Sequence, residues 1–273
     1  MNITELTPQR KELLSGFAEH IAERYCSESN VIMPEKIAEN IGLRFKLGDY
    51  GNAFDGLLVC KSGKYKAFLN THEGAHLHDK RLRFSFAHEL GHFLIDEHRI
   101  SLSEPGVKPR PSFSHFDSND LMEREADHFA ANLLMPRKRI LRDIGYRKFS
   151  YPIIDEISNK YNISATAAII RFITLGNKPV MVVCSRDKMV RWKSNSDDFP
   201  HYKLLYGNRG RVPENTSAGE YFYEGTKNMG KTEPVFAEDW FELRYASERR
   251  QGFFEYCVYH ENLNQVISLI WQK

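Results

Sequence analysis

The sequence lacks the features that mark exported, membrane-spanning or nucleic-acid-coating proteins. Its 273 residues carry a formal net charge of only +2, which argues against a general nucleic-acid coat. No apolar run approaches the roughly 20 residues that cross a bilayer. The start, MNITELTPQRKELL, has neither the basic segment nor the apolar core of a signal peptide. These absences predict a cytoplasmic protein with no membrane partner.

Cysteine is also scarce, and it is not arranged as a framework. The chain has four cysteines and no Cys-x-x-Cys pair. A reduced protein is the simplest interpretation, and structural disulfides are the alternative. The four residues are Cys26, Cys60, Cys184 and Cys257.

Apolar periodicity divides the chain into a helix-rich first part and a strand-rich second part. From Val180 onward short strand-like runs dominate, and one of them is Glu220–Tyr223. A polar loop is predicted over Asp96–Asp117, and Ser118 or Asn119 can cap the helix that follows it. We expect an α+β fold with a domain boundary near residue 177. Helical spacing is found over 8–25, 34–41, 79–95, 119–135, 153–161 and 165–175, and strands are predicted over 43–47, 54–60 and 65–69.

The motif His-Glu-x-x-His, which is typical of zinc peptidases, occurs twice, as His72–His76 and as His88–His92. On a helix, histidines four residues apart lie on one face and can reach one ion, with the glutamate beside them. The first copy contains Gly74 and lacks an apolar stripe, so we predict an exposed loop there. The second copy lies in a predicted half-buried helix, where Gly91 indicates a closely packed neighbour.

A catalytic zinc site needs a third protein ligand, and the next strong helix offers two glutamates. Glu123 and Glu125 lie about 200° apart around the helix axis. Glu123 is on the face that leads into the core, whereas Glu125 is on a polar face that we expect to be solvated. We therefore predict that His88, His92 and Glu123 bind Zn²⁺. Asp127, one turn beyond Glu123, could accept the second ring N–H of a ligating histidine.

These motifs resemble those of the ImmA/IrrE metallopeptidases. The matching stretches are RFSFAHELGH at 83–92 and Glu123-x-x-x-Asp127 with LLMP at 133–136. In addition, 54–56 and 68–70 resemble a small sheet before the active helix. The resemblance runs from about residue 31 to residue 185. It implies a zincin-like metallopeptidase domain over 1–148, a helix-turn-helix-like segment over 149–177, and a mixed α/β GAF-like sensor domain over 178–273.

The same resemblance implies an activity, a cofactor and a substrate. The activity is a gluzincin-type zinc endopeptidase in which Glu89 is the general base. The substrate would be a helix-turn-helix repressor, whose cleavage switches on stress, mobile-element or phage-defence genes after DNA damage or entry of foreign DNA. In some relatives a loop cysteine is thought to restrain the site. Here residues 99–122 contain serines such as Ser112 and Ser114 but no cysteine, so any restraint must work otherwise.

Two segments raise the question of nucleic-acid binding. The helix predicted over 165–175 has a single basic residue and few polar side chains, so a structural module or a dock for the substrate is favoured over a DNA-reading helix. The second part of the chain interleaves cations and rings, which suits single-stranded DNA, although a solvated strand face explains such a pattern more often. The interleaved residues are Lys178, Arg186, Lys188, Arg191, Trp192, Lys193, Tyr202, Lys203, Tyr206, Arg209 and Arg211.

Three functions are therefore compared. The first is a regulatory zinc protease that cleaves a repressor and could be activated by single-stranded DNA. The second is a non-proteolytic transcription regulator or toxin–antitoxin partner with a structural zinc. Glu89 argues against the second, because a structural site needs no general base between its histidines. A digestive peptidase is disfavoured by the absence of an export signal.

Overall fold

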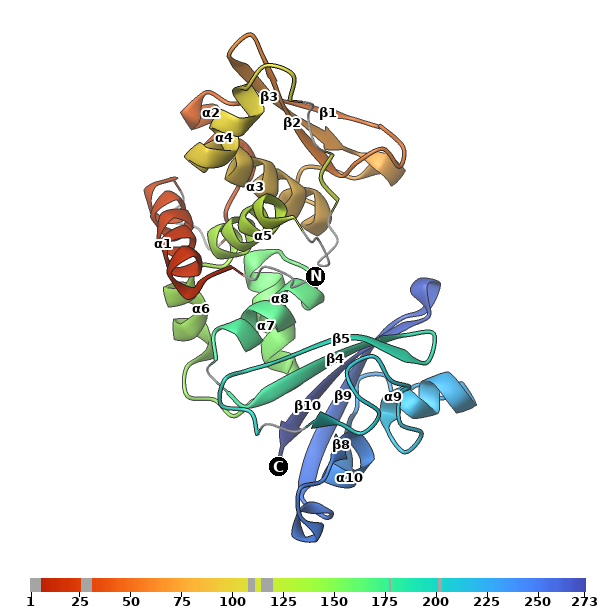
Figure 1. Cartoon of the computed structure of the whole chain (residues 1–273). Helices are drawn as coiled ribbons and strands as arrows, with labels where there is room; N and C mark the ends of the chain where they lie inside the picture. The colour runs from red at the N-terminus through yellow and green to blue at the C-terminus, as the bar shows by residue number, and fades with distance from the viewer. Residues whose placement is uncertain (1–5, 26–30, 108–110, 114–119, 177, 201–202) are drawn as a thin grey trace. The chain divides into compact units, whose positions relative to one another are not determined.

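The computed structural model describes residues 6–25, 31–107, 111–113, 120–176, 178–200 and 203–273 (Figure 1). Its contacts divide the chain into two compact units. The first unit comprises Met1–Gly145 with Asp155–Ala167, and the second comprises Tyr146–Ile154 with Ala168–Lys273. Residue 177, at the predicted boundary, lies outside the described residues. No helix of the described ranges combines the length and the apolar character needed to cross a bilayer.

The first unit contains a small mixed sheet and most of the helices. The strands are β1 (Arg44–Gly48), β2 (Gly56–Lys61) and β3 (Lys64–Asn70), in the order β1-β3-β2. β1 runs parallel to β3, and β2 runs antiparallel to it. Before the sheet come α1 (Pro8–Tyr25) and α2 (Pro34–Ile41), and Gly42 ends α2 in a left-handed conformation. The predicted small sheet is therefore present.

Two helices at the centre of this unit carry the candidate site. α3 (Lys80–Leu94) buries most of the face that its sequence predicts, including Leu82, Phe86 and Leu90. α5 (Leu121–Leu134) is capped by Asp120, whose side chain accepts a hydrogen bond of 2.9 Å from the backbone N–H of Met122. Ser118 and Asn119, the caps expected from the sequence, lie outside the described residues.

The expectation of a polar loop over Asp96–Asp117 is wrong for its first part. Asp96–Ser103 forms a helix, α4, with Asp96 and Glu97 in its first turn. Carboxylates at that end interact favourably with the helix dipole, and His98 anchors the helix by being buried. Three helices directly follow α5 in the chain: α6 (Arg137–Ile144), α7 (Tyr151–Tyr161) and α8 (Ala165–Thr174).

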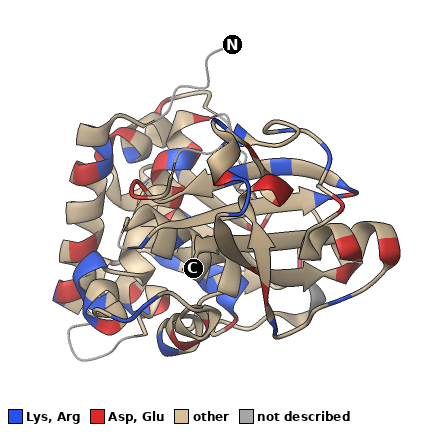
Figure 2. Cartoon of the chain, turned by 90° about the horizontal axis from the view of Figure 1, so that it is seen from below, with Lys and Arg blue, Asp and Glu red and all other residues tan. Residues whose placement is uncertain are grey.

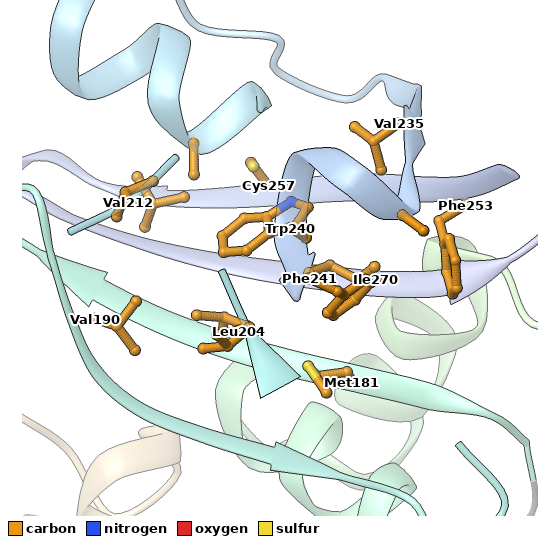
Figure 3. Packing of buried hydrophobic residues seen from close by; sticks show 14 of the residues in the cluster. Met181, Val190, Leu204, Val212, Val235, Trp240, Phe241, Phe253, Cys257 and Ile270 are labelled. Carbon is orange, nitrogen blue, oxygen red and sulfur yellow. The ribbon is translucent and has the colours of Figure 1, made fainter. Parts of the chain in front are cut away.

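The second unit is built around a five-stranded antiparallel sheet with the order β5-β4-β10-β9-β7. Its apolar core holds Trp240, Phe241 and Phe253 among other buried side chains (Figure 3). Elsewhere in the same unit, the ring of Tyr151 stacks on the ring of Tyr256, with ring centroids 3.8 Å apart. The strands are β4 (Val180–Arg186), β5 (Met189–Asn195), β7 (Thr232–Phe236), β9 (Gly252–His260) and β10 (Gln265–Gln272), and a separate pair is formed by β6 (Lys203–Leu204) and β8 (Phe241–Glu242).

One predicted strand of this unit is a helical turn. Glu220–Glu224 forms a π-helical turn that continues α9 (Ser217–Gly219), instead of the strand expected over Glu220–Tyr223. The Thr216 hydroxyl caps its start by accepting from the Gly219 N–H at 2.9 Å. The short helix α10 (Ala237–Trp240) was not predicted. The aromatic residues of this turn explain the wrong prediction, because they are typical of strands.

Candidate metal centre

The candidate site lies where α3 and α5 approach each other closely. A Cβ atom on Gly91 of α3 would stand 3.3 Å from the Cα of Ala126 and 3.2 Å from a ring carbon of Phe129. These distances leave little room for a larger residue. The close neighbour that Gly91 indicates in the sequence is therefore α5.

Three side chains from these helices converge on one point. The Nε2 atoms of His88 and His92 are 3.0 Å apart. The Glu123 carboxylate reaches both rings, at 3.1 Å from His88 Nε2 and 3.3 Å from His92 Nε2. Both histidines are buried, and Glu123 is half-buried. The structure thus brings together the three residues that the sequence predicts as ligands.

The spacing of these three groups fits a shared cation. One ligand atom from each residue lies within 4.8 Å of the others. Ligand atoms about 2.0–2.2 Å from a tetrahedral zinc ion are about 3.3–3.6 Å apart. The observed separations are within a few tenths of an ångström of that spacing. Two imidazoles and a carboxylate are also one of the ligand sets of catalytic zinc.

The charges around this cluster are strongly coupled. Burial opposes a positive charge on His88, but its contacts with Asp127 and Glu123 outweigh burial and raise its pKa to about 10. Burial acts to raise the pKa of Glu123, yet its contacts with the two histidines bring that pKa well below its ordinary range. The cluster therefore pairs anionic carboxylates with a centre of positive charge, which is the role a cation would fill.

Glu89 lies beside the cluster and is removed from solvent. Its side chain is fully buried, and among the described residues neither carboxylate oxygen has a hydrogen-bond partner. Burial raises the pKa of Glu89 above that of an exposed carboxyl group. A cavity of about 20 Å³, lined by Glu89, His92 and Glu123 among others, has room for about one water molecule. The orphaned oxygens and this cavity fit a group that handles the proton of a water.

The outer nitrogen of each predicted histidine ligand also has a partner. His88 Nδ1 is 2.9 Å from Asp127 Oδ1, which is the contact predicted for Asp127. His92 Nδ1 is 3.1 Å from Nδ1 of His98, a residue that the sequence reasoning missed. The only signal for His98 was its position six residues after His92, and it fell in the segment predicted as a loop.

The expected solvation of Glu125 is wrong. Its side chain is buried, with 6 % of the residue exposed, and it contacts His98 and Arg10. The reason is that α1 packs along this face of α5 and covers it. Asn132, on the same face, is also buried and donates to the backbone carbonyl of His128 at 2.8 Å.

The first His-Glu-x-x-His copy does not contribute to the cluster. His72–Gly74 is a single 3₁₀ turn, and His72 and His76 are both exposed. His72 Nδ1 lies 3.5 Å from a carboxylate oxygen of Asp49. The expectation of a connecting segment with exposed histidines is confirmed.

The fold and the site together define an α+β protein with a metallopeptidase-type histidine and glutamate cluster. Residues 71–172, which include all of α3 and α5, match the family model of the IrrE N-terminal-like domain, a peptidase family. This match supports the resemblance to the ImmA/IrrE proteins. A Mycobacterium tuberculosis transcriptional regulator of known structure is similar in fold, with a TM-score of 0.58 and 9% sequence identity, over 97% of this chain and 78% of that chain. No curated protein sequence matches the chain.

Proposed function

We propose that the chain is a zinc-dependent endopeptidase. The single observation that carries this proposal is the convergence of His88, His92 and Glu123 beside the buried carboxylate of Glu89. A site that only held a structural ion would not need a buried, unpaired carboxylate next to the ligands. The match to a peptidase family over the same residues supports the same conclusion.

Each residue of the cluster has a distinct task in the proposed mechanism. His88, His92 and Glu123 would hold the zinc ion, which supplies Lewis-acid chemistry when bound by acidifying a nucleophilic water and polarising a peptide carbonyl. The Glu89 carboxylate takes the proton of the attacking water and returns it to the leaving nitrogen. Burial strengthens it as a base, because removal from water raises its pKa. Asp127 orients His88 through their 2.9 Å contact.

The direct test replaces the proposed base. Glu89→Gln should retain zinc, because the three ligands are untouched, and should lose cleavage activity. The chain offers a matched control in Glu73→Gln, the same change in the first His-Glu-x-x-His copy, which should cleave normally. Zinc content and the rate of substrate cleavage are measured on both variants. Normal cleavage by Glu89→Gln would rule out the mechanism.

We propose a DNA-binding repressor with a helix-turn-helix fold as the protein substrate, as the family resemblance implies. A second cavity of about 290 Å³ in the first unit offers space for a substrate side chain. It is lined by Asp55, which precedes the Gly56 packed against Glu89, and by Ser85, one helical turn before Glu89. Incubating the chain with the repressor encoded nearest to it, with and without a chelator, tests this proposal. The cut should disappear with the chelator, and mass spectrometry of the products locates the bond.

The same experiment separates this function from its main alternative, a regulator that binds DNA or protein and holds a structural zinc. In that case the repressor would bind the chain and remain intact. The fold similarity to a transcriptional regulator shows shared architecture alone. Burial of Glu89 beside the cluster favours the peptidase.

The helix-turn-helix-like segment is proposed to be structural. Arg171, the single basic residue of α8, is buried together with Ile169 and Phe172. A buried arginine cannot reach the edge of a base. The other proposed role of this segment is to bind the protein substrate.

A second property is proposed for the second unit, which we expect to be a GAF-like sensor that binds single-stranded DNA. Exposed rings lie next to cations at two places. The Arg211 guanidinium is 4.4 Å from the ring centre of Tyr206, and the Lys188 ammonium is 5.0 Å from that of Tyr223. The segments that carry Lys188 and Arg211 are joined by a backbone hydrogen bond from Val212 N–H to the Lys188 carbonyl, at 2.8 Å.

Other features weaken this second proposal. Trp192 and Lys193 are partly buried, Asp187 pairs with Arg191 at 3.4 Å, and Tyr202 lies outside the described residues. In Figure 2, basic and acidic residues are interspersed along the ribbon. Titration of a labelled oligothymidine at several salt concentrations tests the idea, with Arg211→Ala as the variant that should weaken binding. No affinity at low salt would remove it.

A further inference from the structure

A chain of side-chain contacts leads outward from the metal cluster through α4 and α5. His92 Nδ1 is 3.1 Å from His98 Nδ1, and His98 Nε2 is 3.0 Å from Glu125 Oε2. All three residues are buried. Buried polar groups of this kind destabilise a protein unless each of them is satisfied. Each of these contacts requires one ring hydrogen, and its position defines the tautomers of His92 and His98.

The outer end of this chain is held by an arginine from the first helix. Arg10 of α1 donates to both oxygens of Glu125, from Nε at 2.9 Å and from Nη2 at 2.6 Å. Its third nitrogen, Nη1, donates to Glu97 at 3.1 Å. A two-point contact between a guanidinium and a carboxylate fixes geometry as well as charge. Arg10 therefore keeps the Glu125 carboxylate anionic and oriented toward His98.

Only one arrangement of protons satisfies these contacts when His92 is a ligand. Its Nε2, which faces Glu123, must then offer a lone pair, so the ring hydrogen is on Nδ1. That hydrogen is donated to His98 Nδ1, which must be unprotonated. The hydrogen of His98 is consequently on Nε2, where it is donated to Glu125. The anionic Glu125 is the acceptor that this arrangement requires.

We infer that His98 is a positioning residue for the metal centre, and that Glu125 and Arg10 hold it in the tautomer that prepares His92 to bind the ion. This inference rests on the proposed function, because it assigns a task toward the metal. We call Arg10, Glu125 and His98 the α1–α5 relay. It gives His92 the support that the Asp127 carboxylate gives His88 directly.

The relay also connects the metal centre to a distant part of the sequence. Arg10 and Glu125 are 115 residues apart, and their contact joins α1 to α5. An apolar side chain at position 98 could fill the same space without such partners. If His98 had a purely structural role, zinc affinity would depend only on the shape of the side chain at position 98. If His98 positions His92, zinc affinity depends on a hydrogen-bond acceptor at the place of Nδ1.

Two substitutions at position 98 separate shape from hydrogen bonding. His98→Leu fills the space and removes the acceptor. His98→Asn places an amide oxygen near the position of Nδ1, where it can still accept from His92. His128→Leu is the control, because His128 also joins α5 to α1, through Ser15 Oγ at 2.9 Å and the Lys11 carbonyl at 3.0 Å, but is not a member of the relay.

The measurement is the zinc affinity of each full-length variant, obtained by competition with a chromophoric chelator. The visible absorption of the cobalt-loaded chain reports the ligand geometry independently of peptidase activity. His98→Leu should bind zinc about 10- to 100-fold more weakly and change the cobalt spectrum. His98→Asn should lose less than His98→Leu, and His128→Leu should match the unchanged chain.

The outcomes distinguish this inference from the proposed function. If the unchanged chain binds no zinc, the proposed function is wrong and the relay loses its purpose. If the unchanged chain binds zinc and His98→Leu binds it equally well, only the relay is overturned. An Asn variant as weak as the Leu variant also overturns it. Thermal unfolding without metal identifies any variant that fails to fold, and His98→Asn then decides the question.

Discussion

The Cα of Gly56 lies directly against the carboxylate of Glu89. A Cβ atom at position 56 would overlap Oε1 of Glu89 and stand 3.0 Å from its Cγ and Cδ. Gly56 begins β2, and its N–H and carbonyl bond to the backbone of Ser112. The glycine therefore provides the space in which the proposed base is held.

The first prediction follows from this contact. The backbone of Gly56 is not left-handed, so alanine is compatible with its conformation, and the three atoms nearest to the added methyl group all belong to Glu89. Gly56→Ala should retain zinc while lowering kcat by about 100-fold, the loss expected when a catalytic group is displaced by about 1 Å. Gly16→Ala is the control, because nothing lies within 4 Å of its added Cβ. A Gly56→Ala variant with full activity would contradict the role of Glu89.

The second prediction concerns the approach of the two helices. Gly91→Val should push α5 away from α3, because the new side chain would collide with the backbone of Ala126. A backbone atom cannot move aside as the end of a flexible side chain can. We expect a loss of about 1–3 kcal/mol in the free energy of unfolding, the usual effect of overpacking, together with weaker zinc binding. Urea unfolding and chelator competition measure the two effects. Gly91→Ala should be milder, because alanine gains about 1 kcal/mol in helix propensity.

The three converging side chains were predictable because the signal is local. Helical spacing alone places His88 and His92 on one face, and it separates Glu123 from Glu125 around the next helix. The helices expected over 8–25, 34–41 and 79–95 and the three strands of the small sheet were predicted for the same reason. The helical phase was sufficient to choose Glu123, which converges with the two histidines, although the solvation expected for Glu125 was wrong.

The parts that could not be predicted depend on distant segments. Glu125 has the polar pattern of a solvated face, and only the packing of α1 shows that Arg10 covers it. His98 was missed because the short α4 has a weak apolar pattern and is held by tertiary contacts. The turn at Glu220–Glu224 was mistaken for a strand because it holds three aromatic residues, which are typical of strands, although only Phe222 among them is buried.

The third prediction concerns Arg83, a buried arginine in α3. The Arg83 guanidinium donates to the backbone carbonyls of Tyr161 and Asn162 at the end of α7, and to that of Ile32. Replacing it by methionine leaves these carbonyls without their donor. Arg83→Met should lower the free energy of unfolding by about 3 kcal/mol.

A neighbouring arginine is the matched control for this prediction. The side chain of Arg81 is 70% exposed, and it pairs with Asp55 at the surface. Arg81→Met should cost less than about 1 kcal/mol, as is usual for exposed ion pairs. Urea unfolding at neutral pH measures both variants. Equal losses of unfolding free energy in the two variants would show that the buried hydrogen bonds of Arg83 stabilise the fold no more than an exposed ion pair does.

A buried carboxyl group in the second unit gives a prediction about pH. Glu255 of β9 is fully buried, and its Oε2 accepts from the Ser217 N–H at 2.9 Å. The Cys257 thiol donates to Oε1 at 3.3 Å. Burial raises the pKa of Glu255, because removal from water disfavours its charged form. Folding therefore favours the protonated form of Glu255 more than the unfolded chain does.

The fourth prediction is the resulting change of stability with pH. In the unfolded chain the Glu255 carboxyl has an ordinary pKa of about 4.3. Since folding raises this pKa, the folded state binds more protons, and its contribution to stability is lost as pH rises from that value through the folded pKa. Glu255→Gln does not titrate, so the free energy of unfolding of the unchanged chain should fall relative to the variant as the pH rises above about 4. Urea unfolding of both proteins at constant ionic strength measures this difference, and a difference that stayed constant across that range would show that Glu255 is already accommodated as a charge.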